Sequence, residues 1–253
     1  MNTYAGLHAR HYDVVYADKP YPEEARFVDS LLREVGVTAG RLLDLACGTG
    51  RHAAEFVSLG WDVTGLDYSE VLLERARLNA PAARFVLQDM RELDLPGESF
   101  DAITCLFDAI GYALGDEAIV ATLMAAGRHL RHKGALVIEF LHAPALRRNA
   151  SPVRVRRYVL PNEGDELLRI SQTRLDEQRN IMNVEFELLE LRADGTYGRW
   201  LEAQANRFFS VEEMQELLER AGLVVERFTA GYREEGEINE ETFHVLAVAR
   251  RSR

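Results

Sequence analysis

A set of aspartates and glycines in the first third of the chain has the composition of a nucleoside-binding site. Asp44 precedes Gly48 and Gly50, and Asp67 and Asp89 follow at the ends of later apolar runs. Glycine at positions 48 and 50 lets the backbone turn sharply and approach a ligand without a Cβ in the way. A carboxylate such as Asp67 can accept hydrogen bonds from both ribose hydroxyls, and Asp89 can accept one from an adenine amino group. This order of residues predicts a pocket for a nucleoside cofactor.

The elements that must position these residues are strands alternating with helices. We expect strands at 41–46, 61–66, 83–87, 100–105 and 135–140, with helices between them and a helical arm before the first strand. Such alternation builds a mostly parallel sheet, which binds ligands beyond the carboxyl ends of its strands. Gly48, Asp67 and Asp89 follow the first three strands, so we expect them at one edge of the sheet.

The sequence pattern changes after residue 147. Four stretches, at 153–160, 166–175, 180–191 and 196–207, alternate polar and apolar residues with a period of two, which indicates antiparallel strands. A helix opening at Ser210 and two closing strands complete the chain. The fold class predicted is α/β, a doubly wound, mostly parallel seven-stranded sheet of Rossmann-like type with an inserted antiparallel β layer. Residues 1–147 form the arm and cofactor-binding core, 148–207 the insertion over the active site, and 208–253 the closing segment.

Composition limits the classes of partner. The 253 residues carry a net charge of −11 and no long run of lysine or arginine, which argues against nucleic acid. No segment approaches 18 uncharged apolar residues, so we expect no membrane span. Two widely spaced cysteines, Cys47 and Cys105, form neither a disulfide framework nor a zinc pattern. We expect a cytoplasmic protein without a metal, a monomer or homodimer, that acts on a small-molecule substrate.

The glycine turn also fits a second cofactor. Gly48, Gly50 and Ala53 match the dinucleotide fingerprint, which would make the chain an NAD-dependent oxidoreductase with Asp67 on the ribose. Asp44 inside the first strand and the long arm before it argue against this interpretation. A third alternative is a protein that keeps the cofactor pocket but has lost catalysis.

Three motifs resemble a known family. Residues 43–50 (LDLACGTG), 63–69 (VTGLDYS) and 88–90 (QDM) look like the cofactor motifs of class I S-adenosylmethionine-dependent methyltransferases. The resemblance covers nearly the whole chain. Residues 12–16 (YDVVY) and 100–112 (FDAITCLFDAIGY) are similar to the subgroup of small-molecule and sugar N,N-dimethyltransferases, which also carries an antiparallel insertion over the active site.

The resemblance implies S-adenosyl-L-methionine as the cofactor, S-adenosyl-L-homocysteine as the product, and a role for each matched residue. Ala46, Gly48 and Gly50 would hold the methionine portion, and Asp67 the ribose. Tyr68 would cover the adenine, with Asp89 and Met90 at its edge. The carbonyl of Cys105 would receive the cofactor ammonium, and the arm would close over the site through Tyr12, Tyr16 and Tyr21.

The expected reaction is in-line transfer of the methyl group to a nitrogen or oxygen of a small molecule, in which positioning supplies most of the rate. We expect Phe107, Tyr112, Arg147 and Trp200 to bind the acceptor. His142 follows the fifth strand and is the candidate general base, because an imidazole titrates near neutral pH. The chain departs from the sugar enzymes after this strand, where it reads EFLHAP at 139–144.

Overall fold

The computed structural model describes residues 6–149 and 152–252 and is built on a seven-stranded sheet. The strand order is β10-β11-β5-β4-β1-β2-β3, in which β10 and β11 run antiparallel to their neighbours and the other five strands are parallel. The strands are β1 (Arg41–Leu45), β2 (Asp62–Asp67), β3 (Arg84–Leu87), β4 (Phe100–Cys105), β5 (Leu130–Leu141), β10 (Leu223–Ala230) and β11 (His244–Arg251). The predicted fold class is confirmed.

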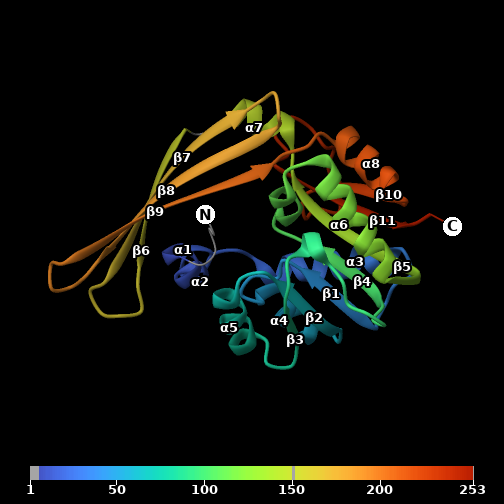
Figure 1. The fold of residues 1–253 in the computed structure, drawn as a ribbon, viewed down its shortest axis with the longest axis horizontal. Coiled ribbons are helices and arrows are strands. Elements are labelled where there is room, and N and C mark those ends of the chain that lie inside the picture. Colours follow the sequence, from blue (N-terminus) through green and yellow to red (C-terminus); the bar gives the residue numbers. More distant parts are fainter. Residues whose placement is uncertain (1–5, 150–151, 253) are drawn as a thin grey trace.

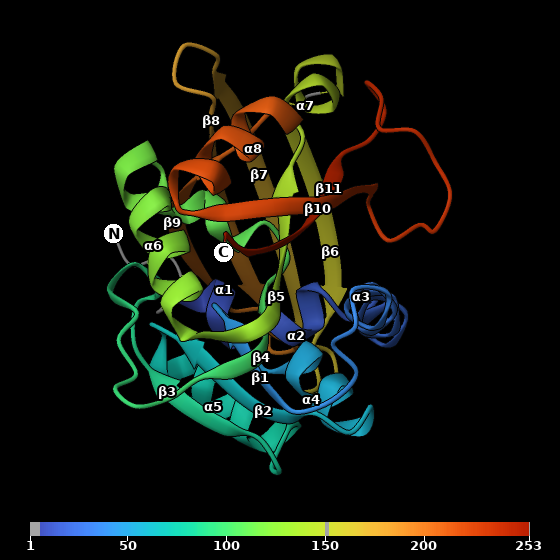
Figure 2. The same cartoon turned by 90° about the vertical axis from the view of Figure 1, so that its right-hand side faces the viewer.

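Helices cover both faces of this sheet, as Figures 1 and 2 show. They are α1 (Leu7–Arg10), α2 (Tyr12–Val15), α3 (Tyr21–Glu34), α4 (Arg51–Ser58), α5 (Glu70–Asn79), α6 (Asp116–His129), α7 (Ala143–Asn149) and α8 (Val211–Arg220), with short 3-10 turns η2 (Met90–Glu92) and η3 (Ala109–Ala113). One apolar cluster joins α3 and α4 to the sheet, and another joins α6 and α8 to its opposite face. None of the helices in the described ranges is long and apolar enough to span a bilayer.

Local sequence explains where several helices begin. Pro22 lies in the first turn of α3, where its missing N–H costs nothing. Ser69 caps α5 by accepting a hydrogen bond from the Leu72 N–H. Ser210 and Glu213 form a reciprocal capping box at the start of α8. These residues therefore fix where α3, α5 and α8 begin.

A second sheet is made by the insertion. Its antiparallel strands, in the order β6-β7-β8-β9, are β6 (Val153–Val159), β7 (Glu166–Asp176), β8 (Ile181–Leu191) and β9 (Tyr197–Arg207). One face packs on the arm through Leu7, Leu167, Phe186 and Leu188, all buried. In Figure 1 this sheet arches away from the core, with α1 and α2 beside it. The predicted period-two strands are confirmed.

Two local expectations differ from the structure. The fifth strand begins at Leu130 rather than 135, because Leu130 pairs with Phe100 of β4 before the register shifts. Residues 143–149 form α7, which the sequence did not predict, although Pro144 in its first turn is compatible with a helix.

Candidate functional site

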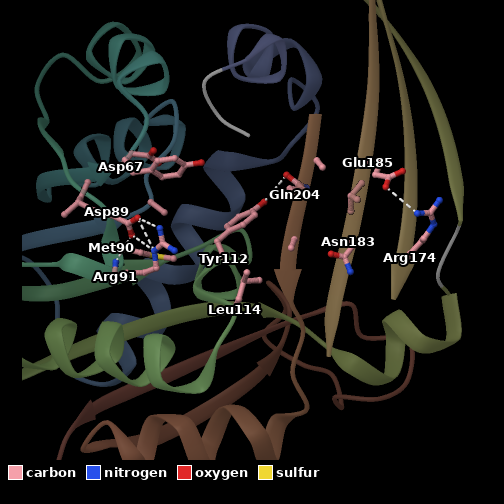
Figure 3. Close-up of a pocket in the computed structure, with 16 residues that line it drawn as sticks. Asp67, Asp89, Met90, Arg91, Tyr112, Leu114, Arg174, Asn183, Glu185 and Gln204 are labelled. Carbon is pink, nitrogen blue, oxygen red and sulfur yellow. Dashed lines mark hydrogen bonds and ion pairs between the residues drawn. The ribbon is translucent and has the colours of Figure 1, made fainter. Parts of the chain in front are cut away.

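A cleft of about 960 Å³ lies between the carboxyl ends of β1, β2 and β3 and the insertion sheet. Its lining comes from both parts of the chain: Ala46, Leu66, Asp67, Tyr68, Asp89, Met90, Arg91, Tyr112 and Leu114 from the core, and Arg174, Asn183, Val184, Glu185, Ala203, Gln204 and Ala205 from the insertion. Figure 3 shows the core residues on one side and the strands of the insertion on the other. The predicted cofactor end and the inserted layer therefore share one cavity.

The glycine turn after β1 has the conformation that its composition predicts. Ala46, Gly48 and Gly50 all have positive φ, at 54°, 56° and 71°. A Cβ added to Gly48 would meet no heavy atom within 4 Å, so this face of the turn is open to a ligand. A Cβ at Gly50 would come within 2.9 Å of the Ala76 Cβ. Gly50, expected in cofactor binding, is instead needed for packing the turn against α5.

Asp67 ties this turn to the end of β2. Its Oδ2 accepts a hydrogen bond of 2.9 Å from the Gly48 N–H, and its Oδ1 accepts one of 2.9 Å from the Ser69 N–H. Burial raises the pKa of Asp67 to about 6, although the backbone N–H groups of Ser69, Gly48 and Tyr68 favour its charged form. The carboxylate is thus held rigidly at the cleft wall, where it can accept further hydrogen bonds from a diol.

The residues predicted to contact the adenine, Tyr68, Asp89 and Met90, lie together in the cleft. Tyr68 is 41% exposed, so its ring is accessible beside the cleft. Asp89 accepts a hydrogen bond of 2.5 Å from Arg91, which lowers the pKa of that carboxyl. Met90 is buried beside them. An aromatic face, a carboxylate and an apolar wall are what a purine needs for stacking and edge recognition.

A second cavity of about 30 Å³ lies where the arm meets the glycine turn. Tyr12 and Tyr21 line it together with Ala46, Gly48 and Phe107. This is the arrangement expected for the methionine end of the cofactor. Tyr16, which was also expected there, lies outside the lining and packs edge-on against the Phe107 ring at 5.1 Å.

The arm is pinned to the core by two hydrogen bonds that Asp13 accepts. Its Oδ1 accepts from the Thr49 hydroxyl at 2.7 Å, and its Oδ2 accepts from Asn79 at 3.2 Å. Asn79 also donates to the Thr49 carbonyl at 2.8 Å. Sequence reasoning missed Asp13, although it stands in the aromatic YDVVY stretch.

The acceptor residues divide into two groups. Phe107 lines the small cavity, and Tyr112 lines the cleft with its hydroxyl 3.5 Å from Gln204 Oε1 of β9.

The side chain of Cys105, a residue expected to contact the cofactor, is buried at the end of β4. Its expected contact, through the carbonyl, stays a prediction.

Of the five residues expected to bind the acceptor or act on it, three line neither cavity. His142 is 5% exposed and directs its Nδ1 at the Thr242 carbonyl, 2.9 Å away. Arg147 donates to Asn180 Oδ1 at 2.7 Å and lies over the Phe208 ring. Trp200 belongs to the apolar face of the insertion sheet that packs on the arm. The expectation that these three residues lie at the cleft is wrong, because each side chain makes its contacts elsewhere in the structure.

The geometry fits S-adenosylmethionine. The open face of Gly48, the carboxylate of Asp67 and the accessible ring of Tyr68 follow one another along a single wall. Asp44, which the sequence already placed in this motif, lies beside this wall and accepts a hydrogen bond of 2.8 Å from the Thr104 hydroxyl. Burial raises the pKa of Asp44 to about 6.

Comparison with known proteins identifies the family. The Methyltransferase domain family model matches residues 42–134. A dTDP-3-amino-3,6-dideoxy-alpha-D-glucopyranose N,N-dimethyltransferase of Streptomyces fradiae is 30% identical over 230 residues, which cover 90% of this chain and 88% of that protein. The structure of CalS10 with bound SAM, an amino pentose methyltransferase of Micromonospora echinaspora, is 28% identical with a TM-score of 0.75 over 100% and 99% of the two chains. The chain belongs to the S-adenosylmethionine-dependent methyltransferases.

The methyltransferase also matches the sugar N-methyltransferase KedS8 of Streptoalloteichus, at 27% identity and a TM-score of 0.80 over 98% of this chain and 94% of that one. The cofactor of the present methyltransferase is S-adenosyl-L-methionine, and the enzyme acts on a small molecule. The NAD-dependent oxidoreductase considered from the dinucleotide fingerprint is excluded by this family membership.

Sequence reasoning also missed charged residues near the ends of β4 and β5 in the methyltransferase. Glu139 is 1% exposed within an apolar strand, and Asp108 is 7% exposed after β4. A charge inside a buried strand was the available signal, because buried carboxylates require partners.

We expect Asp67→Ala to weaken S-adenosylmethionine binding by about 1.5–3 kcal/mol, since hydrogen bonds to a charged group contribute this much. Isothermal calorimetry measures the change. Asp62→Ala is the matched control, because Asp62 begins the same strand and is exposed. Unchanged affinity in a folded Asp67→Ala protein would remove Asp67 from the ribose site.

Affinity for S-adenosylmethionine should fall as the pH drops through about 6. The raised pKa of Asp67, about 6, means that the carboxylate is ionised above this value and gains a proton below it. The protonated form is a poorer acceptor for ribose hydroxyls. Calorimetric titrations with S-adenosylmethionine from pH 8 to pH 5 compare the pH dependence of the affinity in the wild type with that in Asp67→Asn. Asp44 titrates in both proteins, so an identical pH dependence would contradict the assignment to Asp67.

Proposed function

We propose that the methyl acceptor is an amine nitrogen of a small polar molecule of the amino-sugar type. The observation that carries this is the continuity of the cleft, which runs from Asp67 and Asp89 to the polar side chains of Asn183 and Gln204. Support also comes from the names of the similar proteins, since the Streptomyces fradiae enzyme methylates an amino sugar linked to dTDP and KedS8 is a sugar N-methyltransferase.

The charges along the cleft favour this class of acceptor. Its lining carries three carboxylates, of Asp67, Asp89 and Glu185, and two arginines. Arg91 is paired with Asp89 and Arg174 with Glu185, at 2.5 Å and 3.4 Å. The remaining excess of negative charge at Asp67 suits a ligand with cationic character, such as the cofactor itself and an amine that arrives beside it.

The residues of the chain act mainly by positioning. S-adenosylmethionine supplies an activated methyl group on a sulfonium sulfur. Tyr12, Tyr21 and Phe107 close the methionine end and exclude water, while Tyr112 and Gln204 present a hydroxyl and an amide to the acceptor. An amine that arrives neutral attacks without losing a proton first, so orientation provides most of the rate enhancement.

A panel of amines and alcohols tests the acceptor class. With S-adenosylmethionine present, we expect S-adenosylhomocysteine to form with amino sugars, including dTDP-3-amino-3,6-dideoxy-D-glucose, and not with the matched sugars that carry a hydroxyl in place of the amine. Mass spectrometry then locates the added methyl on nitrogen. Turnover of the hydroxyl sugars alone would refute the amine assignment. Binding of the cofactor without turnover of any acceptor in the panel would favour the inactive alternative.

His142 should not behave as a general base. Its Nδ1 donates to the Thr242 carbonyl, and burial lowers its pKa. Loss of a general base typically costs about 10²-fold or more in kcat. We expect His142→Gln to keep kcat close to the wild-type value with the same pH profile. A loss of about 10²-fold at unchanged S-adenosylmethionine affinity would restore His142 as the base.

A further inference from the structure

A charged cluster joins the turn after β4, the last part of β5 and the start of β11. His244 Nδ1 is 3.1 Å from Asp108 Oδ1 and 3.2 Å from Glu139 Oε1. The three side chains offer nitrogen and oxygen atoms that all lie within 4.8 Å of one another. Both carboxyl groups are buried, whereas 39% of the His244 side chain is exposed. Two carboxylates therefore converge on a single imidazole nitrogen at the margin of the core.

The cluster is bonded directly to the turn that carries Phe107. The Phe107 N–H donates to Glu139 Oε2 at 2.5 Å, and the Tyr232 hydroxyl donates to the same oxygen at 2.6 Å. Phe107 and Asp108 both have left-handed backbone, with φ of 55° and 58°. Residues other than glycine adopt this conformation only when the surrounding structure holds them in it. The hydrogen bonds of Glu139 and Asp108 are part of what holds them.

Phe107 is the link between the cluster and the cofactor end of the site. It lines the small cavity beside Gly48 and Tyr12. Its ring also contacts the arm, since Lys19 Nζ lies 4.3 Å from its centroid and the Tyr16 ring meets it edge-on. A shift of the turn would therefore move one wall of the cavity and loosen the arm above it.

Charge balance favours a protonated His244. The groups that face it are the carboxylates of Asp108 and Glu139; Lys19 acts on both carboxylates through its charge, and the Tyr232 hydroxyl donates to Glu139 Oε2. Burial opposes a charge on His244, yet the charges and hydrogen bonds of the two carboxylates outweigh it and raise its pKa. Burial likewise disfavours charge on Glu139, but His244 and Lys19 prevail and lower its pKa. A neutral imidazole would leave two buried carboxylates with less compensation.

We infer that His244 is a positioning residue, an imidazolium that bridges Asp108 and Glu139 and thereby holds Phe107 against the methionine end of the cofactor cleft. It joins three segments that are remote in sequence, namely the turn after β4, strand β5 and the start of β11. It acts through Phe107 and does not itself line either cavity. The inference rests on the proposed function for its effect on turnover, but its structural part can be tested without an acceptor.

Histidine NMR gives the first test. The chain has seven histidines, so ¹⁵N-histidine labelling yields few signals, and His244→Gln assigns the one of interest. At pH 8 we expect both ring nitrogens of His244 to carry protons. His132, an exposed histidine on β5, gives a second ring signal for comparison. A neutral His244 at pH 8 would overturn the inference.

Hydrogen exchange gives the second test. In His244→Gln we expect the Phe107 amide to exchange roughly tenfold faster or more, because its acceptor Glu139 loses its charged partner. Amides of the Gly48 turn should be unchanged, and His132→Gln should leave both regions as in the wild type. His244→Lys restores a cation and should restore protection at Phe107. Equal exchange in wild type and His244→Gln would show that the cluster does not hold the turn.

Turnover separates positioning from simple stability. With an amino sugar that the wild type methylates as the acceptor, His244→Gln should lower kcat and weaken calorimetric affinity for S-adenosylhomocysteine, because the Phe107 wall of the cofactor cavity moves, and His244→Lys should recover part of both. If the wild type methylates no amine of the panel, the proposed acceptor class fails, and the NMR and exchange results still decide the role of His244. Zn²⁺ titration is the last control. Stoichiometric binding that disappears in His244→Gln would make the cluster a metal site and overturn the imidazolium bridge.

Discussion

The hydrogen bond from the Gly48 N–H to Asp67 Oδ2 joins the turn after β1 to the end of β2, and the site is built around it. It requires a backbone N–H that points outward from a positive-φ turn, which Gly48 provides at φ 56°. It also requires a carboxylate held at the neighbouring strand end, which parallel pairing of Asp44 with Gly65 and Leu45 with Leu66 places beside that turn. Because the bond fixes two strand ends at once, the turn after β1 and the end of β2 keep one fixed position relative to each other.

The arrangement of the fold follows from patterns that are local in sequence. The alternation of strands and helices up to residue 141, the period of two in the insertion, and the capping residues Ser69 and Ser210 each act over a few residues. Such signals survive tertiary packing, so the elements and the fold class could be predicted. The early start of β5 could not, because Leu130 is extended only through its pairing with Phe100 of a different strand.

The placement of residues at the two cavities could be predicted where it depends on the backbone turn or on a strand end, as at Gly48, Asp67 and Asp89. It could not be predicted where it depends on the direction of a side chain. Trp200 and Gln204 lie four residues apart on β9, yet one packs in the arm-facing cluster and the other lines the cleft. The contact between Asp108 and His244 joins residues 136 apart, a separation over which no sequence pattern carries a signal.

The pinning of the arm by Asp13 determines how much room lies beneath it. The cavity there, about 30 Å³, has room for about one water molecule. Admitting a larger group, such as the amino acid portion of a cofactor, would require the hydrogen bonds that Asp13 accepts from Thr49 and Asn79 to open. Because Ala46 lines both this cavity and the wide cleft, a movement of the arm would enlarge a space that adjoins the cleft.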